Sequence, residues 1–414
     1  MRLRWAYAAR TLAGPWVALA VIVLDVGVAL LRGAPYLGEA VFTVRWMALA
    51  VWMISALVGA VAAVDSAHLA QPGRRHLSLA TAGGRREFVW AALWAEVPAA
   101  VVHLLAILVL FGIGGAPHPF VGWFPVALAM AAQAASIMWF AALGSFVGRL
   151  TQPVVAGLLG AAGAYAASLI FTTVSSGGRG FHPLGDSGAT ISQVGLVWNT
   201  GFLWLQLTIT LLTAGLLLLS RPRAAHGWLL PSPAIVAAGF VVVILLGASM
   251  KVPGNQMVPT AEEPTHCAGT DPTICVYGEH ERNAAPDIAT VRQLVNSARE
   301  AGYDALVPAQ VVEASRSRNP GDPDSRTTAF GPIEQDPDDV SILIQEMLTP
   351  AWCPALSGND AIPDHYWTDM ENIVYTWSGQ LGDATIFTGD EHTLSPEDIS
   401  EILNRWAACD LGAT

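Results

Sequence analysis

The sequence predicts a mainly α-helical membrane protein, in which a polytopic transmembrane helical bundle precedes a small, helix-rich α/β domain with disulfide bonds outside the membrane. The chain of 414 residues is 53% hydrophobic and only 13% charged. Residues 1–251 contain 14 Lys/Arg and 6 Asp/Glu, whereas residues 252–414 contain 7 and 27. A long apolar region with so few charges excludes an ordinary soluble enzyme and a disordered protein.

Seven apolar runs are long enough to cross the roughly 30 Å hydrocarbon core of a bilayer. They lie near residues 13–31, 46–64, 88–112, 123–148, 153–174, 197–219 and 233–250. We therefore expect a six-span core over residues 13–220, and a cytosolic loop with a seventh span over residues 221–251. Small residues such as Gly157 and Gly160 favour close packing between these helices.

Residues 1–12 combine three arginines with Trp5 and Tyr7. Two interpretations are open for this segment. It is either an amphipathic helix that lies in the inner membrane interface, or a positively charged flank that only sets the orientation of the first span.

The arginines predict the orientation of the spans, because short cytosolic loops carry an excess of Lys and Arg. With a cytosolic N-terminus, the inner segments of the first 250 residues hold ten arginines and the outer segments hold three. The inner ones are Arg2, Arg4, Arg10, Arg74, Arg75, Arg85, Arg86, Arg149, Arg221 and Arg223, and the outer ones are Arg32, Arg45 and Arg179. Seven spans then place residues 251–414 outside the cell. All four cysteines lie in that part, which indicates two disulfides in an oxidising compartment.

The loop expected between the second and third spans, residues 65–87, is the most informative cytosolic segment. It begins with polar residues, is interrupted at 72–73 and 83–84 by Pro-Gly and Gly-Gly, and allows a short helix from His76. It is either a helix that lies flat below the membrane, where another protein acts on it, or a solvated positive flank without a partner.

This layout resembles the permease subunit of type-2 ATP-binding-cassette exporters, which has an N-terminal interfacial helix, six spans, and a coupling helix between the second and third spans. The run Ala82-Gly83-Gly84-Arg85-Arg86-Glu87-Phe88 is similar in style to the end of that coupling loop. The resemblance covers residues 1–220. It implies that a separate nucleotide-binding subunit docks on this loop, through Arg74, Arg75, His76, Arg85, Arg86 and Glu87.

The resemblance further implies export of a peptide, lipid or antibiotic-like substrate by a homodimer or by a pair with a sister permease. ATP and Mg would belong to the partner ATPase subunit, and this chain would bind no cofactor and catalyse no reaction itself. The only lysine, Lys251, precedes Val252, so no Gly-Lys-Ser/Thr phosphate loop occurs in the sequence. Membrane lipid is a further expected partner, and nucleic acid is not.

The chain departs from the simple family pattern after residue 220, where a seventh span and an external domain follow. Within that domain, the run Cys275-Val276-Tyr277-Gly278-Glu279-His280 is similar to the C-terminal ectodomains of some actinobacterial transporter permeases. The resemblance implies a class of protein and no reaction.

Four polar residues are expected at membrane depth, where charged groups are costly and face the protein interior. They are Asp25, Glu96, His103 and Gln133. Glu96 and His103 are seven residues apart and therefore share a helix face. These groups either line a translocation path or gate, or form hydrogen bonds that hold the helices together.

The external part is predicted to contain a linker, residues 252–264, and a domain, residues 265–414. Helices are expected at 286–301, 337–348, 364–378 and 396–408, with a short strand at 305–307 and a polar loop at 313–329. Gly302 would end the first of these helices, and Ser395 would cap the last.

Four cysteines allow three pairings, of which we prefer Cys267–Cys275 and Cys353–Cys409. A metal site is not expected. His266, Glu279, His280, His365 and Asp369 are available, but they lack an H-E-x-x-H or comparable spacing, and no G-x-S-x-G nucleophile turn is present.

Two other functions remain open from the sequence. The chain could be a membrane-anchored sensor or immunity protein whose outer domain binds an external peptide or protein without transport. It could also be a membrane-embedded enzyme that uses Glu96 and His103.

Overall fold

The computed structural model describes most of the chain and divides it into two compact units. The described residues are 10–31, 38–71, 84–114, 122–175, 192–220, 256–259, 264–282, 284–313, 327–330, 339–350, 353, 363–380 and 392–411. The first unit, here called the bundle, comprises residues 1–32, 40–190 and 197–258. The second, here called the C-terminal unit, comprises residues 33–39, 191–196 and 259–414.

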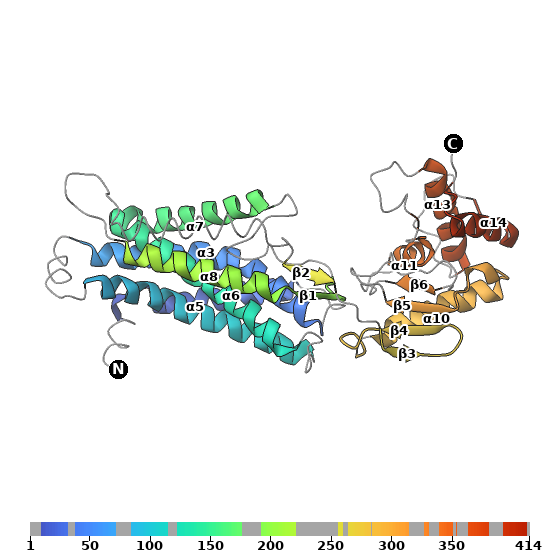
Figure 1. Cartoon of the computed structure of the whole chain (residues 1–414), viewed down its shortest axis with the longest axis horizontal. Helices are drawn as coiled ribbons and strands as arrows, with labels where there is room; N and C mark the ends of the chain where they lie inside the picture. The colour runs from blue at the N-terminus through green and yellow to red at the C-terminus, as the bar shows by residue number, and fades with distance from the viewer. Residues whose placement is uncertain are drawn as a thin grey trace. The chain divides into compact units, whose positions relative to one another are not determined.

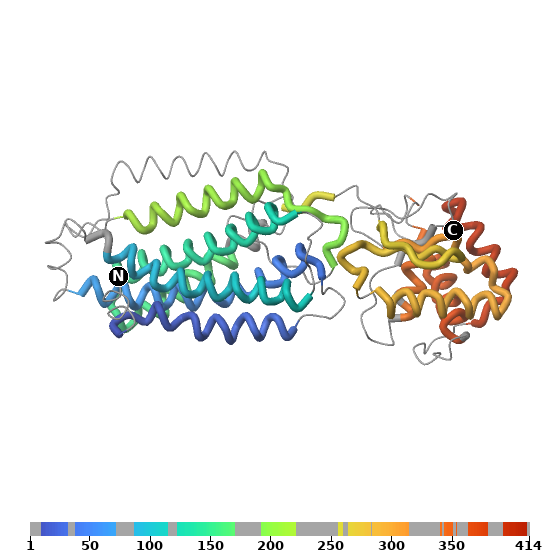
Figure 2. Tube along the Cα trace, turned by 90° about the horizontal axis from the view of Figure 1, so that it is seen from below, coloured from blue at the N-terminus to red at the C-terminus, as the bar shows by residue number. Residues whose placement is uncertain are grey.

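Long helices that run side by side form the bundle, as Figures 1 and 2 show. They are α2 (Val17–Leu30), α3 (Ala40–Leu69), α5 (Gly84–Gly114), α6 (Trp123–Leu150), α7 (Pro153–Ser175) and α8 (Thr200–Leu219), and the 3-10 turn η1 (Gly14–Trp16) precedes α2. Each helix coincides with one of the first six predicted apolar runs. The prediction of an apolar helical bundle is thereby confirmed.

Four helices of the described chain are long and apolar enough to cross a membrane: α3, the 87–114 part of α5, α6 and α8. The apolar stretches Gly14–Leu30 and Pro153–Leu169 are shorter. The chain is therefore a membrane protein. The seventh predicted span, 233–250, and most of the N-terminal segment 1–12 lie outside the described residues, so the count of seven spans stays a prediction.

Small residues allow α3 to approach α6 and α7 closely. A Cβ atom added at Gly144 of α6 would clash with the carbonyl oxygen of Gly59 on α3, and one added at Gly160 of α7 would lie 2.6 Å from the same oxygen. Gly157, also on α7, lies against Val64. The predicted role of the small residues of the fifth span in helix packing is confirmed.

The predicted loop 65–87 is shorter in the structure. The helix α3 continues to Leu69, because Asp65, Ser66 and Ala67 are buried and the side chains of Asp65 and Ser66 are hydrogen-bonded within the bundle. The helix α5 begins at Gly84, so Arg85, Arg86 and Glu87 belong to its first turn. Residues 72–83, with the predicted helix from His76, lie outside the described residues.

In the part of the C-terminal unit that the structure describes, a four-stranded sheet and four helices form the core. The strands β3 (His266–Ala268), β4 (Thr273–Val276), β5 (Gln310–Glu313) and β6 (Thr327–Phe330) lie in that order, with β3 antiparallel to β4 and the other neighbours parallel. The parallel β4–β5 pair needs a crossover, and α10 (Ala284–Glu300) provides it. The helices α11 (Asp339–Leu348), α13 (Asp364–Gln380) and α14 (Pro396–Ala407) follow.

A second, two-stranded sheet consists of β1 (Leu196–Trp198) and β2 (Met257–Pro259).

The helices α10, α11, α13 and α14 begin and end within two residues of the predicted bounds. The apolar stripe of α10 is buried through Val291, Leu294 and Ala298, and Gly302 follows with a φ of 79° that favours glycine. The Ser395 side chain and Asp398 form the reciprocal hydrogen bonds of a capping box at α14.

The strand expected at 305–307 is wrong. Asp304–Leu306 forms the 3-10 turn η3, and Leu306 is buried. The next residue but one is Pro308, which has no N–H to donate to a strand ladder. The strand that does form, β5, begins two residues after this proline, at Gln310.

Both preferred disulfides are present. Cys267 and Cys275 join opposite positions of β3 and β4, while Cys353 is joined to Cys409, which follows the end of α14. The two bonds span 8 and 56 residues of sequence.

Candidate functional site

Asp65 fixes the N-terminal segment at one end of the bundle, here called the Asp65 end. Its carboxylate accepts the backbone N–H groups of Ala13 and Gly14, each at 2.9 Å. Gly14 also lies directly against α5, since a Cβ atom there would be 2.9 Å from the backbone nitrogen of Ala95. The start of η1 and α2 is thus held by both α3 and α5.

Ser66, the next residue of α3, continues these contacts toward α5 and α6. Its hydroxyl donates to Ser145 Oγ at 2.9 Å, and the Ser145 hydroxyl donates to the Phe88 carbonyl at 3.5 Å. Both serines are fully buried. Three helices are therefore joined by polar contacts at the Asp65 end.

Arg149 adds α8 to this group. Its guanidinium donates to the carbonyl oxygens of Leu217, Leu218 and Ser220 at 2.5, 3.2 and 2.7 Å. These carbonyls lie at the C-terminal end of α8, where backbone acceptors lack partners within the helix and a cation is favourable. The guanidinium carbon also lies 5.5 Å from the centre of the Phe88 ring.

Of the predicted coupling residues, Glu87 is the neighbour in sequence of Phe88, which belongs to this network. Glu87 is exposed in the first turn of α5, directly before Phe88. Arg85 and Arg86 precede it in the same turn, while Arg74, Arg75 and His76 lie outside the described residues. The roles of Asp65 as a cap and of Arg149 as a link between helices were not predicted from the sequence. An aspartate and an arginine at the ends of long apolar runs were the available signals.

A second buried polar group lies among the helices and includes three of the four residues expected at membrane depth. His103 of α5 has Nδ1 2.9 Å from Asp25 Oδ1 of α2 and Nε2 2.9 Å from Gln133 Oε1 of α6. The Gln133 amide donates to the Val44 carbonyl of α3 at 2.7 Å. Asp25 and His103 are 2% and 0% exposed. A continuous series of hydrogen-bonded side chains therefore joins four helices.

Glu96 takes no part in this chain. It is half-buried, whereas its expected companion His103 is bonded to residues of two other helices. Sharing a helix face did not make these two residues partners, because the partners of His103 come from residues 78 and 30 positions away in sequence.

The third group, in the C-terminal unit, places His280 between two carboxylates. Its Nε2 lies 2.8 Å from Glu39 Oε1, and its Nδ1 is bonded to Glu313 Oε1. Glu39 also accepts the Ser192 hydroxyl at 2.6 Å and the Gln193 N–H at 2.7 Å. His280, Glu39 and Glu313 are buried. The stretches around residues 39 and 192 are thereby tied to the sheet of this unit.

The charge of His280 follows from these partners. Burial alone lowers the pKa of His280, but the charge of Glu313 and hydrogen bonds to Glu313 and Glu39 outweigh burial and raise that pKa well above 6.5. Both ring nitrogens face carboxylate oxygens, so both donate. The ring is an imidazolium at neutral pH.

The run from Cys275 to His280 gains a structural role from this cluster. Cys275 is bonded to Cys267, and the backbone N–H of Tyr277 donates to Glu313 at 2.8 Å. The turn that follows places His280 against the same carboxylate. This sequence motif therefore positions the charged histidine.

Two of the other residues considered as metal ligands form ion pairs instead. His266 pairs with the exposed Glu281 at 3.1 Å, and Asp369 pairs with Arg405 at 2.8 Å. Within the part of the chain that the structure describes, no group of three or more His, Cys, Asp or Glu is placed to hold a metal ion.

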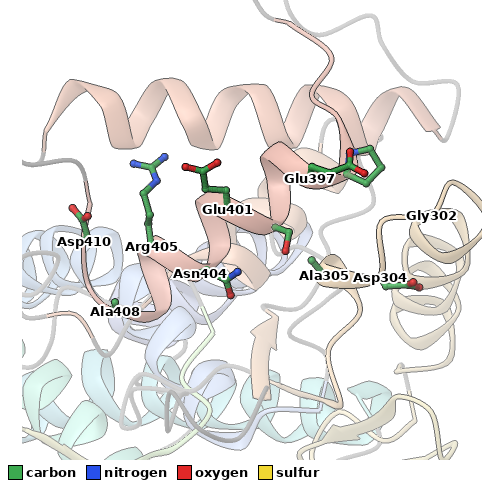
Figure 3. Close-up of a pocket in the computed structure, with 11 residues that line it drawn as sticks. Gly302, Asp304, Ala305, Glu397, Glu401, Asn404, Arg405, Ala408 and Asp410 are labelled. Carbon is green, nitrogen blue, oxygen red and sulfur yellow. The ribbon is translucent and has the colours of Figure 1, made fainter.

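An open groove of about 790 Å³ lies along α14 in the C-terminal unit (Figure 3). Its lining includes Asp304, Glu397, Glu401 and Asp410, together with Arg405, which is paired with Asp369. The lining therefore carries more negative than positive charge.

Comparisons of the chain with protein-family models, with curated proteins and with solved structures find no match.

Proposed function

We propose that the chain is the membrane-spanning permease subunit of an ATP-binding-cassette transporter that exports a peptide, lipid or antibiotic-like substrate. A separate subunit would bind and hydrolyse ATP, and the permease would form a homodimer or pair with a sister permease. The Asp65 end would face the cytosol, and the C-terminal unit would lie outside the cell.

The arrangement of the Asp65 end carries this proposal. A partner that pushes on the segment between α3 and α5 acts on two helices at once, because α3 ends at Leu69 and α5 begins at Gly84. From there, Asp65 reaches the N-terminal segment, and Ser66, Ser145 and Arg149 reach α6 and α8. Buried polar contacts of this kind hold a fixed geometry. A local push would therefore move several helices together.

The bundle contains a further feature suited to transport. Asp25, His103 and Gln133 place polar groups among helices whose other buried side chains are mainly apolar. Polar groups at membrane depth are costly unless they are paired. Their position makes them candidates for a gate or for the wall of a substrate path, with Glu96 as a separate, half-buried candidate.

The test is reversal of the charge at the predicted docking site. Changing Arg85 and Arg86 together to Glu should abolish both co-purification with the ATPase subunit in mild detergent and stimulation of its ATP hydrolysis. The matched control changes Arg221 and Arg223 to Glu, which reverses two charges in another predicted cytosolic loop. Equal loss in both variants, or loss in neither, would contradict the proposed docking site.

The absence of any ATPase partner from wild-type preparations would favour the sensor or immunity function instead. In that case a labelled external peptide should bind the full-length protein without any transport into or out of vesicles.

A further inference from the structure

The hydrogen bonds around Gln133 fix the direction of its side-chain amide. The amide group 2.7 Å from the Val44 carbonyl must be the NH₂, because a carbonyl oxygen can only accept. The amide oxygen then faces His103 Nε2 at 2.9 Å. Since that oxygen can only accept, Nε2 must carry a hydrogen.

The second ring nitrogen defines how many protons the pair holds. His103 Nδ1 lies 2.9 Å from Asp25 Oδ1. If Nδ1 is protonated, the ring is an imidazolium that donates to a carboxylate. If Nδ1 is not protonated, Asp25 must be a carboxylic acid that donates to it, because a lone pair and a carboxylate would repel each other. Each form contains one proton between the two side chains.

We propose that Asp25 and His103 form a binding site for a single proton within the bundle, and that the contact between α2 and α5 depends on this proton. The site goes beyond the proposed transport function and does not require it. Its ligand is the proton itself, shared by a carboxyl and an imidazole from different helices.

The burial of the site supports this assignment. Asp25 Oδ2 is buried and has no hydrogen-bond partner among the described residues, and the two side chains are 2% and 0% exposed. Loss of the proton would leave one negative charge there, on a carboxylate whose Oδ2 has no hydrogen-bond partner among the described residues. Such a charge is strongly disfavoured in a low-dielectric surrounding, so the contact between the two helices should open instead.

Few other charges can replace the proton. The helices around the pair carry further charged or titratable groups only at the following positions: Arg45, Asp65 and His68 on α3, Arg85, Arg86, Glu87 and Glu96 on α5, and Arg149 on α6. Glu96 is seven residues before His103, which is about 10 Å along a helix. Asp65, His68, Glu87 and Arg149 belong to the Asp65 end.

Spectroscopy on the unaltered full-length protein tests the proton count. In lipid nanodiscs at neutral pH, nitrogen-15 NMR of labelled histidine reports the charge of His103, and infrared spectroscopy reports un-ionised carboxyl groups. His103→Gln and Asp25→Asn serve to assign the signals. We expect either a neutral His103 with an un-ionised Asp25, or an imidazolium with a carboxylate. A neutral His103 with an ionised Asp25, or an imidazolium with an un-ionised Asp25, would overturn the proposal.

A distance measurement tests the dependence of the helix contact on the proton. Spin labels replace Val23 on α2 and Val109 on α5, which are 71% and 58% exposed; the four native cysteines are disulfide-bonded and do not react. The distance distribution should broaden in the Asp25→Leu variant, because a leucine of similar shape has no hydrogen to share with Nδ1. It should stay narrow in the Asp25→Asn variant, because the asparagine amide donates to Nδ1. Equal behaviour of the two proteins would overturn the proposal.

Discussion

The bundle and the C-terminal unit each bury one histidine in a polar cluster, and the two clusters differ in charge. His103 faces one carboxylate and one amide, and its contact with Asp25 holds a single proton. His280 faces two carboxylates and is positively charged between them. In the bundle the pair is neutral overall, as an apolar surrounding requires. In the C-terminal unit the cluster keeps a net negative charge and satisfies it with further donors from Tyr277, Ser192 and Gln193.

The two units also differ in what stabilises them. The bundle depends on close approach of small residues, such as Gly59 against Gly144, and on a few buried polar contacts. The C-terminal unit has a small core, two disulfides and charged pairs. Covalent bonds and charges suit a small domain in an oxidising space, whereas helix packing suits the bilayer.

The largest expected effect is that of His280→Ala. Removing one partner from a buried ionic cluster leaves uncompensated charge, and we expect the C-terminal unit to lose about 3–5 kcal/mol. Hydrogen exchange of the full-length protein should show faster opening of β4, β5 and α10, with the bundle unchanged. The control is His266→Ala, which removes an exposed histidine and should have little effect. Comparable opening in both variants would contradict the role given to His280.

Removing each disulfide separately should show how much it stabilises the C-terminal unit. A disulfide that closes a longer loop reduces the entropy of the unfolded chain more and therefore stabilises the folded unit more. Loss of Cys353–Cys409 should lower the free energy of unfolding by about 4 kcal/mol, and loss of Cys267–Cys275 by about 2.5 kcal/mol. Denaturant unfolding of double Cys→Ser variants, followed by hydrogen exchange of α13 and α14, measures both. A larger cost for the shorter loop would contradict this order.

The pH dependence of the C-terminal unit follows from His280. Its pKa is raised above the unfolded value, so the stabilisation is fully present below about pH 6.5 and is lost as pH rises through the raised pKa. Hydrogen exchange of β5 should therefore accelerate with pH beyond the intrinsic exchange rate. An Asp25→Asn change in the bundle should leave this profile unaltered. A profile that instead shows increasing stability with rising pH would refute the charged histidine.

The smallest expected effect concerns the Asp65 end. Asp65→Ala removes both acceptors from the Ala13 and Gly14 N–H groups, and loss of a helix cap costs about 0.5–2 kcal/mol. Thermal unfolding in detergent should show a modest decrease in melting temperature, while exchange at residues 13–16 increases strongly. The Asp65→Asn variant keeps one acceptor oxygen. Its melting temperature should lie between those of the unaltered protein and the Asp65→Ala variant. A decrease spread evenly over the bundle would show that Asp65 does not act as a local cap.

Local patterns in the sequence were sufficient for much of the fold. Apolar runs predicted six helices, the Val291–Leu294–Ala298 stripe predicted α10, and Ser395 predicted the start of α14. Each of these signals depends on neighbours within a few residues. The disulfide partners were also predicted, although the sequence offered three possible pairings.

Contacts between distant residues could not be predicted in this way. Asp25 and His103 are 78 residues apart, and Glu39 and His280 are 241 apart. Spacing along one helix connected His103 with Glu96 instead, and an apolar run suggested a strand at 305–307 although Pro308 prevents it. Asp65 was expected to begin a polar loop. In the structure it is buried and caps the backbone N–H groups of Ala13 and Gly14, a role that depends on the packing of distant segments.

Site-specific crosslinking tests whether a nucleotide-binding partner contacts the Asp65 end. A photoreactive residue is placed at the exposed Glu87 of α5 or, as control, at the 49% exposed Trp123 that begins α6. Illumination of cells that produce the full-length protein should join the Glu87 position, but not the Trp123 position, to a protein that a photoreactive ATP analogue also labels. Such an adduct at Trp123 alone, or at neither position, would contradict the account.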